Sequence, residues 1–371
     1  MQIGCPTEVK PQEYRVGLTP MAAAEAVAHG HKVLVQAGAG LGAGFSDADY
    51  TAAGVRLARD AAEVWGAADL VIKVKEPQPA ERAMLRRGQV LFTYLHLAPD
   101  PDQTRDLIAS GATCIAYETV TDAAGGLPLL APMSEVAGRL APQVGAWTLQ
   151  KANGGRGVLL GGVPGVAPGK VTVIGGGVVG THAARVAAGM GADVTVLDRS
   201  LPRLRYLDDV FGRDFKTLYA SAAHVAQAVA EADLVIGAVL IPGAAAPRLV
   251  TRAQLATMKR GAVIVDVAID QGGCFETSRP TTHQDPIYEV DGVMHYCVAN
   301  MPGAVARTST LALGNATLPF LIALADKGWR RACAEDIHLQ RGLNVHAGQV
   351  TNAAVGQALG IAAITTEAAL R

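Results

Sequence analysis

Short apolar runs separated by alanine-rich stretches fill the first third of the chain. Residues 32–36, 70–74, 90–94 and 112–117 have the length and the apolar composition of buried strands. Amphipathic alanine-rich stretches lie between these runs, for example at residues 20–29, and they predict helices. Strands that alternate with helices in this way predict a mostly parallel sheet with helices on its faces.

A second alternating series follows the glycine-rich loop at residues 154–169. Its predicted strands are residues 171–174, 194–197, 234–239, 262–266 and 294–298. Their almost continuous apolar composition is typical of parallel strands that are buried on both faces. The pattern therefore predicts two α/β sheets of the doubly wound kind, one before and one after this loop.

Two longer helical patterns accompany the strands. One predicts a helix near residues 134–150, with an apolar stripe of Val136, Leu140, Val144 and Trp147. Ser134 is its predicted N-cap, because the hydroxyl can accept a hydrogen bond from a free first-turn N–H. The second predicts a helix near residues 308–327, with a stripe of Leu311, Leu318, Ile322 and Ala325. After Pro302 the pattern predicts helices throughout and no further strand.

The length of 371 residues, about twice that of one domain, predicts two domains. The tail after residue 302 is short for a third domain, so we expect it to return to the first. The predicted domains are residues 1–133 together with 302–371, and residues 134–301. The two long helices would connect them. A single large domain remains the alternative.

Composition and charge narrow the function classes. Half of the residues are hydrophobic and 18% are charged, which can fill a sizeable core. Lys and Arg number 32 and Asp and Glu number 33, giving a net charge of -1 without a basic block. A nucleic-acid partner is therefore not expected.

The cysteines and the termini indicate the compartment. The five cysteines are odd in number and widely spaced, and no CxxC motif occurs, which predicts a reduced cytoplasmic protein. The N-terminus has several charges and no apolar segment of a signal peptide. No uninterrupted apolar stretch reaches about 18 residues, so we expect no membrane span.

A glycine-rich motif follows the first strand of the second series. Residues 171–174 lead directly into Gly175-Gly-Gly177-Val-Val-Gly180 and then into a helix-like run at residues 181–190. Strand, tight turn and helix are the setting in which GxGxxG binds a dinucleotide. Gly175 permits the turn, Gly177 lets the backbone approach a pyrophosphate at the helix N-terminus, and Gly180 allows close packing. A glycine turn without a ligand is the alternative.

An acidic residue completes the dinucleotide pattern. The next predicted strand is followed by Asp198, at the position where a carboxylate accepts hydrogen bonds from the adenosine ribose. The same charge would repel a 2′-phosphate, so Asp198 favours NAD over NADP. Arg199 follows directly and would weaken that discrimination.

Four polar residues lie in loops or just after predicted strands, where ligands bind in open α/β sheets. Arg15 lies in an N-terminal loop, and Lys75, His96 and Asp270 each follow a predicted strand. Each alone has a structural alternative, as a solvated cation, a core histidine or a turn aspartate. Together they suit the oxidation of an amino or hydroxy acid. Two cations can clamp a carboxylate, and His and Asp can move protons.

Longer sequence blocks resemble the alanine dehydrogenase family over nearly the whole chain. They are Met1-Gln-Ile-Gly-Cys-Pro-Thr-Glu-Val-Lys10 with Arg15-Val-Gly-Leu-Thr-Pro20, Val173–Gly180, Asp233–Gly243, Val265–Glu276 with Ser278–Thr282, and Tyr296–Pro302. Blocks of this length are far more specific than GxGxxG alone.

The resemblance implies the reversible oxidative deamination of L-alanine to pyruvate and ammonium with NAD. It implies that Arg15 and Lys75 bind the substrate, and that His96 and Asp270 are the acid–base residues. Residues 134–301 would form a Rossmann NAD-binding domain, and the discontinuous domain would bind the substrate. The family's usual assembly is a homohexamer.

The resemblance also implies which residues line the cofactor, in addition to the three motif glycines. They are Ser134, Val178, Val179, Asp198, Arg203, Val239, Leu240, Val267, Ala268, Ile269, Asp270, Arg279, Val298, Ala299, Asn300 and Met301.

The chain departs from the family pattern at two places. A serine often found just after the tyrosine of the third Rossmann segment is absent, since Tyr219 is followed by Ala220. A hydroxyl on Ser221 would point elsewhere, so that cofactor contact is not transferred. Some members bind a metal through Glu and His one helical turn apart. Ala323 and Lys327 stand at those positions here, so no metal is expected.

Two other functions remain open at this stage. A nicotinamide nucleotide transhydrogenase α-like subunit would share the nucleotide-binding half, but it needs membrane helices and a partner chain. A non-catalytic NAD-binding protein would not need the acid–base set.

Overall fold

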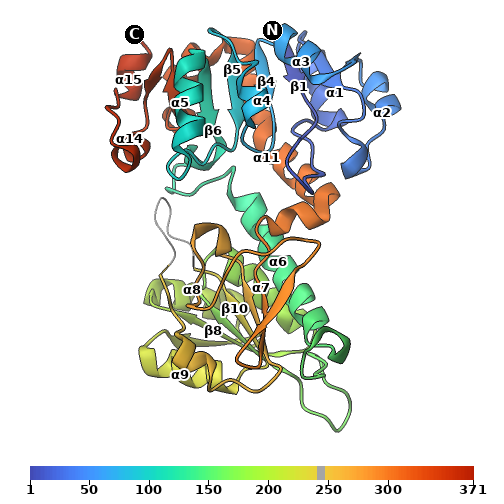
Figure 1. The fold of residues 1–371 in the computed structure, drawn as a ribbon, viewed down its shortest axis with the longest axis vertical. Helices are drawn as coiled ribbons and strands as arrows, with labels where there is room; N and C mark the ends of the chain where they lie inside the picture. The colour runs from blue at the N-terminus through green and yellow to red at the C-terminus, as the bar shows by residue number, and fades with distance from the viewer. Residues whose placement is uncertain (240–246) are drawn as a thin grey trace. The chain divides into compact units, whose positions relative to one another are not determined.

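The chain folds into two compact α/β units. A computed structural model describes residues 1–239 and 247–371. One unit comprises Met1–Met133 with Val305–Arg371, and the other comprises Ser134–Ala304. Each unit has its own sheet (Figure 1).

The first unit contains a sheet flanked by helices. Its strands are β1 (Gln2–Cys5), β2 (Lys32–Gln36), β3 (Arg56–Ala58), β4 (Leu70–Ile72), β5 (Val90–Thr93), β6 (Thr113–Ala116), β14 (Leu343–His346) and β15 (Gln349–Val350). Its helices are α1 (Pro20–Ala28), α2 (Asp47–Ala52), α3 (Ala61–Ala67), α4 (Pro79–Arg82), α5 (Pro101–Ser110), α11 (Ala306–Lys327), α12 (Trp329–Glu335), α13 (Ile337–Gln340), α14 (Ala353–Leu359) and α15 (Thr366–Ala369).

The order of these strands reverses next to β1. Within the described residues the sheet order is β15-β14-β6-β5-β4-β1-β2-β3, and β1 to β6 run parallel. The chain therefore leaves β1 towards β2 and β3, and then returns to β4 on the other side. Ligands of open α/β sheets bind at the carboxyl ends of the strands where the order reverses, here β1 and β4.

The prediction that strands stop after Pro302 is wrong. β14 pairs antiparallel with β6 and with β15. The β14–β15 turn contains Ala347 and Gly348, both with positive φ, as a tight hairpin turn requires. Asn or Asp usually marks the first of these positions, and an alanine there hides the turn in the sequence.

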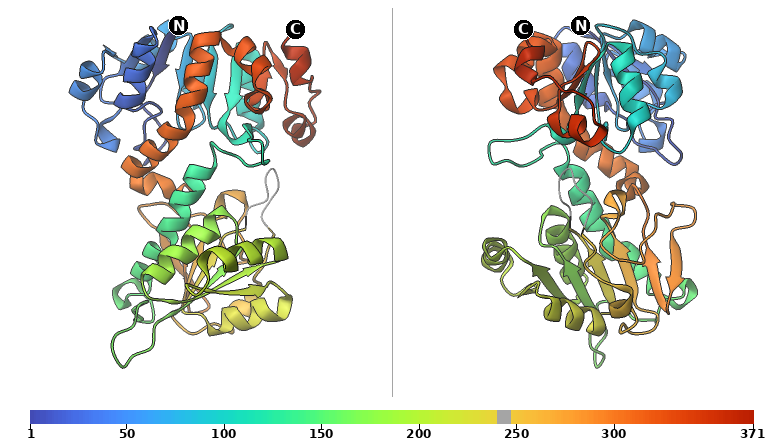
Figure 2. Two further views of the ribbon diagram at one scale, coloured as in Figure 1. Left: turned by 180° about the vertical axis from the view of Figure 1, so that it is seen from behind. Right: turned by 60° about the vertical axis from the view of Figure 1, so that its left-hand side comes forward.

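Helix α11 lies close to its predicted bounds but buries a different stripe. Its buried residues include Leu313, Thr317, Leu321 and Leu324. Of the predicted stripe, Ala325 is buried, whereas Leu311 is exposed. The buried face of α11 contains small and polar residues beside the leucines, and α11 packs against α1. Figure 2, seen from behind, shows α11 on the face of the sheet opposite to α5.

One segment of the described chain could cross a membrane by length and composition alone. It is Met301–Lys327, a short 3-10 helix, η5 (Met301–Val305), followed by α11, and 44% of its apolar window is buried. Core helices meet the same criterion, and α11 contacts α1 and α12.

The second unit contains the other sheet. Its strands are β7 (Lys170–Ile174), β8 (Asp193–Asp198), β9 (Lys216–Tyr219), β10 (Leu234–Gly237), β11 (Val263–Asp266), β12 (Ile287–Val290) and β13 (Val293–Tyr296). Its helices are α6 (Ala131–Thr148), which begins in the first unit, α7 (Val178–Gly189), α8 (Leu201–Phe211), α9 (Ala222–Glu231) and α10 (Arg252–Leu255). This unit also contains the 3-10 turns η3 (Lys151–Asn153) and η4 (Ile269–Gln271), whereas η1 (Leu41–Ala43) and η2 (Tyr117–Thr119) lie in the first unit.

This sheet has the strand order of a dinucleotide-binding fold. Among the described residues the order is β12-β13-β11-β10-β7-β8-β9, and only β12 is antiparallel to its neighbour. Numbered from β7 and without β12, this is the order 3-2-1-4-5-6 of a Rossmann sheet. The order reverses between β7 and β10. The two doubly wound sheets predicted from the sequence are confirmed.

The nine predicted strands are present, with ends that differ by up to two residues. Four strands besides β14 and β15 were not predicted, namely β1, β3, β9 and β12. β3 is only three residues long, β9 is largely exposed and β12 is only partly buried, so neither length nor a buried apolar run distinguishes them.

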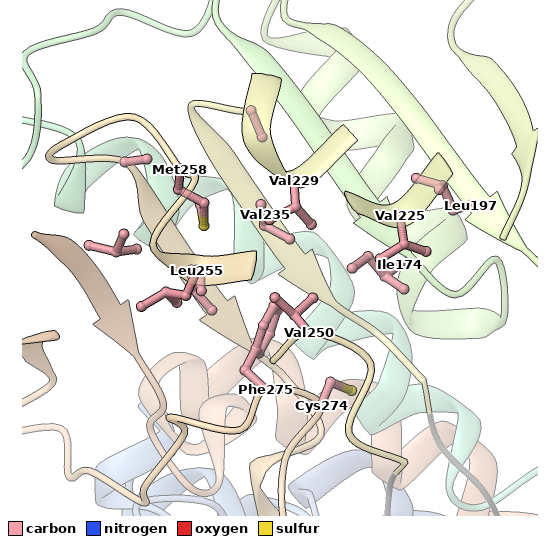
Figure 3. Close-up of a cluster of buried hydrophobic side chains, with 14 of the residues drawn as sticks. Ile174, Leu197, Val225, Val229, Val235, Val250, Leu255, Met258, Cys274 and Phe275 are labelled. Carbon is pink, nitrogen blue, oxygen red and sulfur yellow. The ribbon is translucent and has the colours of Figure 1, made fainter. Parts of the chain in front are cut away.

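Both faces of the second sheet are covered, which explains its continuous apolar strands. On one face, side chains of β7, β10 and β11 pack with Val225 and Val229 of α9 and with Leu255 of α10 (Figure 3). Phe275, after β11, is completely buried in the same cluster. On the other face, α6 approaches α7 so closely that a Cβ on Gly138 would lie 2.3 Å from the carbonyl oxygen of Val179.

Helix α6 begins three residues earlier than predicted, so Ser134 lies inside its first turn and is not its N-cap. Pro132 suits this position, because a proline in the first turn loses no helical hydrogen bond. Val136 and Leu140 of the predicted stripe are buried, but Trp147 is 40% exposed.

Phe275→Ala is expected to lower the free energy of unfolding by about 3–5 kcal/mol, because the lost ring leaves a cavity in a closed core. Urea unfolding followed by circular dichroism measures the loss. Leu159→Ala is the control, because Leu159 is 67% exposed and its truncation should change stability by less than about 0.5 kcal/mol. Equal losses for the two variants would contradict this assignment of the core.

Candidate active site

The glycine turn after β7 has the geometry that the motif predicts. Gly175 has a φ of 101°, and a Cβ there would lie 2.8 Å from the carbonyl oxygen of Ala238, at the start of the β10 loop. A Cβ on Gly180 would lie 1.7 Å from the carbonyl oxygen of Gly175. A Cβ on Gly177, in contrast, would meet no heavy atom of the described chain within 4 Å. Folding therefore requires Gly175 and Gly180, whereas Gly177 leaves open space above the turn.

The N-terminus of α7 faces this open space. Gly177 is the N-cap and has no side chain to satisfy the first-turn N–H groups, and that turn contains no acidic residue. Val178 is 43% exposed, whereas Val179 is buried. Uncapped N–H groups and the helix dipole favour an anion here, so the turn fits a dinucleotide pyrophosphate.

Asp198 ends β8 beside the glycine turn. Its carboxylate accepts hydrogen bonds from the backbone N–H of Gly176 and of Ser200, both at 2.7 Å. Each carboxylate oxygen has a second lone pair that can accept from a ribose hydroxyl. Arg203 supports the same turn, because its Nε donates to the carbonyl oxygen of Gly176 and its Nη2 donates to Thr181.

Ala220, which stands where the family often has a serine, and the neighbouring Ser221 both take part in local structure. The N–H of Ala220 donates to the carbonyl oxygen of Asp198 at 2.9 Å. Ser221 is the N-cap of α9 and accepts from the N–H of His224, so its hydroxyl serves the helix.

The other predicted cofactor residues gather at the same edge of the sheet. They follow the carboxyl ends of parallel strands: Val239 after β10, Val267, Ala268, Ile269 and Asp270 after β11, and Val298, Ala299, Asn300 and Met301 after β13. Arg279 lies further along the β11 loop, stacked on Tyr288 at 4.0 Å. Ser134 lies in α6. Leu240 lies outside the described residues.

A buried carboxylate that the sequence did not single out anchors the β11 loop. Asp266 is completely buried and accepts from Ser278 Oγ at 2.5 Å and from the N–H of Cys274 at 2.8 Å. Burial raises the pKa of Asp266, and these hydrogen bonds oppose the rise. The two ends of the segment that carries Asp270 and Arg279 are thereby fixed.

In the first unit, Arg15 is buried and paired. Its Nε and Nη2 donate to the two carboxylate oxygens of Glu13, at 2.6 and 2.5 Å, and its Nη1 donates to Met133 Sδ at 3.1 Å. Burial acts to lower the pKa of Arg15, but Glu13 outweighs burial, and the pKa lies above its ordinary value. Arg15 therefore stays charged while buried.

His96 stands on a strained turn after β5. Its φ is 49°, a conformation that few residues other than glycine adopt. Glu118 stabilises this turn by accepting from the N–H of His96 at 2.6 Å and from the N–H of Leu95 at 3.2 Å. The imidazole stacks on Tyr94 and is 46% exposed, so it is open to a ligand.

Lys75 follows β4, and β4 lies next to β5 in the sheet. Its carbonyl oxygen accepts from Thr93 Oγ1 at 3.0 Å, at the end of β5. Arg15, Lys75 and His96 thus lie beyond the carboxyl ends of β1, β4 and β5, which are neighbours in one sheet. Asp270, exposed within η4, belongs to the second unit.

Comparison with known proteins assigns the family. The model described as "Alanine dehydrogenase/PNT, N-terminal domain" matches residues 4–137, and the model described as "Alanine dehydrogenase/PNT, C-terminal domain" matches residues 141–353. The chain belongs to the alanine dehydrogenase/PNT family. The alanine dehydrogenase of Halomonas elongata is 64% identical over 97% of both chains.

Solved structures of the alanine dehydrogenase/PNT family have the same fold. An L-alanine dehydrogenase is 52% identical over 97% of this chain and 99% of its own, with a TM-score of 0.94. A transhydrogenase from Sinorhizobium meliloti is 28% identical over 95% of this chain and all of its own, with a TM-score of 0.82. Membership of this family implies a nicotinamide cofactor, and the turn at Gly177 fits one.

Sequence reasoning missed the carboxylates that bind the loops of the predicted site residues. Glu13, Glu118 and Asp266 each accept hydrogen bonds from the loop that carries a predicted site residue. Glu118 is hidden by its separation from His96, which it follows by 22 positions. Glu13, two positions before Arg15, and Asp266, four positions before Asp270, are local to their site residues.

The different environments of two glycines give a paired test of the dinucleotide site. Gly177→Ala should leave the melting temperature within about 2 °C and raise the dissociation constant of NADH about tenfold, because the methyl group occupies the open space. Gly180→Ala should lower the melting temperature by about 4 °C or more, because its Cβ collides with the backbone of Gly175.

NADH fluorescence titration and thermal unfolding measure the two effects. Binding of NADH by Gly177→Ala with the affinity of the unsubstituted chain would exclude this turn as the pyrophosphate site.

Proposed function

We propose that the chain catalyses the reversible, NAD-dependent oxidative deamination of L-alanine to pyruvate and ammonium. One observation carries the proposal: Arg15, Lys75 and His96 follow neighbouring strands of one sheet in a chain 64% identical to an alanine dehydrogenase. Residues 1–133 with 302–371 serve as the substrate domain, and residues 134–301 serve as the Rossmann domain for NAD.

Arg15 and Lys75 bind the substrate carboxylate and carbonyl side. Two donors of the Arg15 guanidinium are used by Glu13, and Nη1 donates to the sulfur of Met133, a weak acceptor. A carboxylate oxygen of the substrate replaces that sulfur at Nη1. Because Glu13 neutralises Arg15, Lys75 supplies the additional positive charge that an anionic substrate requires.

His96 and Asp270 perform the acid–base steps. Bound NAD would supply the acceptor for the hydride of alanine Cα. Loss of this hydride and of one proton from the α-ammonium group converts alanine to iminopyruvate. Asp270 orients water towards the imine carbon, and His96 takes and returns protons as pyruvate and ammonium form. The strained backbone of His96, held by Glu118, fixes the direction of the imidazole.

The preference for NAD rests on Asp198. Its carboxylate already accepts from Gly176 and Ser200, and its remaining lone pairs would accept from the adenosine ribose hydroxyls. A 2′-phosphate would bring a second negative charge to the same place. We further propose a homohexamer in the cytoplasm, without a bound metal.

An activity panel tests the proposal against its alternatives. The purified chain should reduce NAD with L-alanine and oxidise NADH with pyruvate plus ammonium, with rates at least about tenfold lower for serine, glycine and NADP. Absorbance at the NADH wavelength measures each rate.

Two outcomes of the panel contradict the proposal. Hydride exchange between NADH and an NADP analogue, without alanine turnover, indicates a transhydrogenase subunit. NADH binding without either activity indicates a non-catalytic binding protein.

Removing either acid–base group should affect turnover and spare cofactor binding. His96→Ala and Asp270→Asn should each lower kcat about 10²–10⁴-fold, because proton transfer loses its positioned group. The dissociation constant of NADH should stay within about twofold, since the glycine turn is unchanged. His29→Ala is the control, because His29 is partly exposed and pairs with Asp326. Turnover of either variant at the rate of the unsubstituted chain would refute its role.

A further inference from the structure

A buried charge cluster lies at the point where the strand order of the first sheet reverses. Glu8 follows β1, Lys73 follows β4, and both side chains are almost completely buried. Lys73 Nζ lies 3.2 Å from Glu8 Oε2 and 2.7 Å from Glu81 Oε1. None of these three residues has a role in the proposed chemistry, yet ligands of such sheets bind at this edge.

Glu8 also binds the backbone on the N-terminal side of Lys75. Its Oε1 accepts from the N–H of Val74 at 2.7 Å, and its Oε2 accepts from the N–H of Lys75 at 3.3 Å. β4 ends at Ile72, so the sheet no longer pairs these N–H groups in the regular way. A buried N–H needs an acceptor, and here one carboxylate serves two in succession.

The adjoining β5 segment holds the carbonyl groups of the same two residues. The N–H of Tyr94 donates to the carbonyl oxygen of Val74 at 3.3 Å, and Thr93 Oγ1 donates to that of Lys75 at 3.0 Å. The peptide units on both sides of Lys75 are therefore fixed: Glu8 holds the two N–H groups, and the β5 segment holds the two carbonyl groups. The direction in which the Lys75 side chain leaves the backbone follows from this.

Lys73, 3.2 Å from the Glu8 carboxylate, favours the ionised form of Glu8. Burial raises the pKa of Glu8, and the charge of Lys73 opposes that rise. A buried ion cluster is a poor source of stability compared with apolar packing. An apolar side chain at position 8, however, would leave the two N–H groups without their acceptor.

We propose that Glu8 is a positioning residue that aims Lys75 at the substrate, with Lys73 as its counterion. The proposal rests on the proposed function, in which Lys75 binds the carboxylate and carbonyl side of the substrate.

Glu81, the other carboxylate that contacts Lys73, provides the comparison for a test. Its oxygens accept from Lys73 and from the N–H of Gln78, which begins α4, so its contacts lead away from Lys75.

The test compares Glu8→Gln with Glu81→Gln in the full chain. Both substitutions remove one buried charge next to Lys73, so both should lower the melting temperature. Glu8→Gln presents an NH₂ group to one of the two backbone N–H groups and should raise the KM for pyruvate at least about tenfold at saturating NADH. Glu81→Gln should change that KM less than about threefold. NADH affinity, which depends on the other unit, should stay within about twofold in both.

Hydrogen exchange gives a readout that does not depend on activity. The amides of Val74 and Lys75 should exchange faster in Glu8→Gln than in the unsubstituted chain, and at the ordinary rate in Glu81→Gln. If Glu8→Gln does not fold, Glu8→Asp retains the charge but draws the carboxylate back by one methylene, and it should give the same increases.

Two results would overturn the proposal. One is an unchanged KM for the Glu8 variants in a chain that turns over pyruvate. The other is an equal rise in KM for the Glu8 and Glu81 variants, which indicates a structural role alone. If the unsubstituted chain does not turn over alanine or pyruvate, the proposed function fails by itself. The exchange rates of the two amides then decide whether Glu8 holds this segment.

Discussion

Parallel strand pairing is the constraint on which both sites depend. Parallel strands place all their carboxyl ends at one edge of a sheet, and the loops that follow must begin there. In each sheet the strand order reverses between two neighbours, β1 with β4 and β7 with β10. At these points the loops leave in opposite directions and expose the strand ends. The glycine turn occupies the second point, and the segments that carry Arg15 and Lys75 lie at the first.

Backbone pairing ends where the loops of the predicted site residues begin, and buried or partly buried carboxylates take over. Glu8, Glu118 and Asp266 each accept at least two backbone N–H groups just beyond a strand or within the turn it leads into. A buried carboxylate is costly to desolvate, and removing one partner of a buried ion pair costs about 3–5 kcal/mol. These groups therefore do more to specify conformation than to stabilise the fold. Rigid loops are what a proton donor or a carboxylate clamp requires.

The accuracy of sequence reasoning followed the range of the interactions involved. The nine apolar strands and the glycine turn were predicted because strand composition and GxGxxG are local features. The C-terminal strands were missed because β14 is defined by its pairing with β6, more than 200 positions earlier in the chain. The apolar stripe of α11 was misplaced because its partner α1 admits small and polar side chains such as Thr317. The N-terminus of α6 was placed three residues late because Ser134 is a good cap in isolation.

The sequence alone determined the family and the doubly wound class and supplied the candidate site residues, since these are written in contiguous blocks and in local periodicity. It determined that Arg15, Lys75 and His96 each stand in a loop, but not what holds them. Only the tertiary structure decided that Glu13 pairs with Arg15, that Glu118 fixes the strained turn at His96, and that Glu8 holds the backbone of Lys75. The physical reason is that a buried carboxylate is defined by the donors around it, and the fold alone brings those donors together.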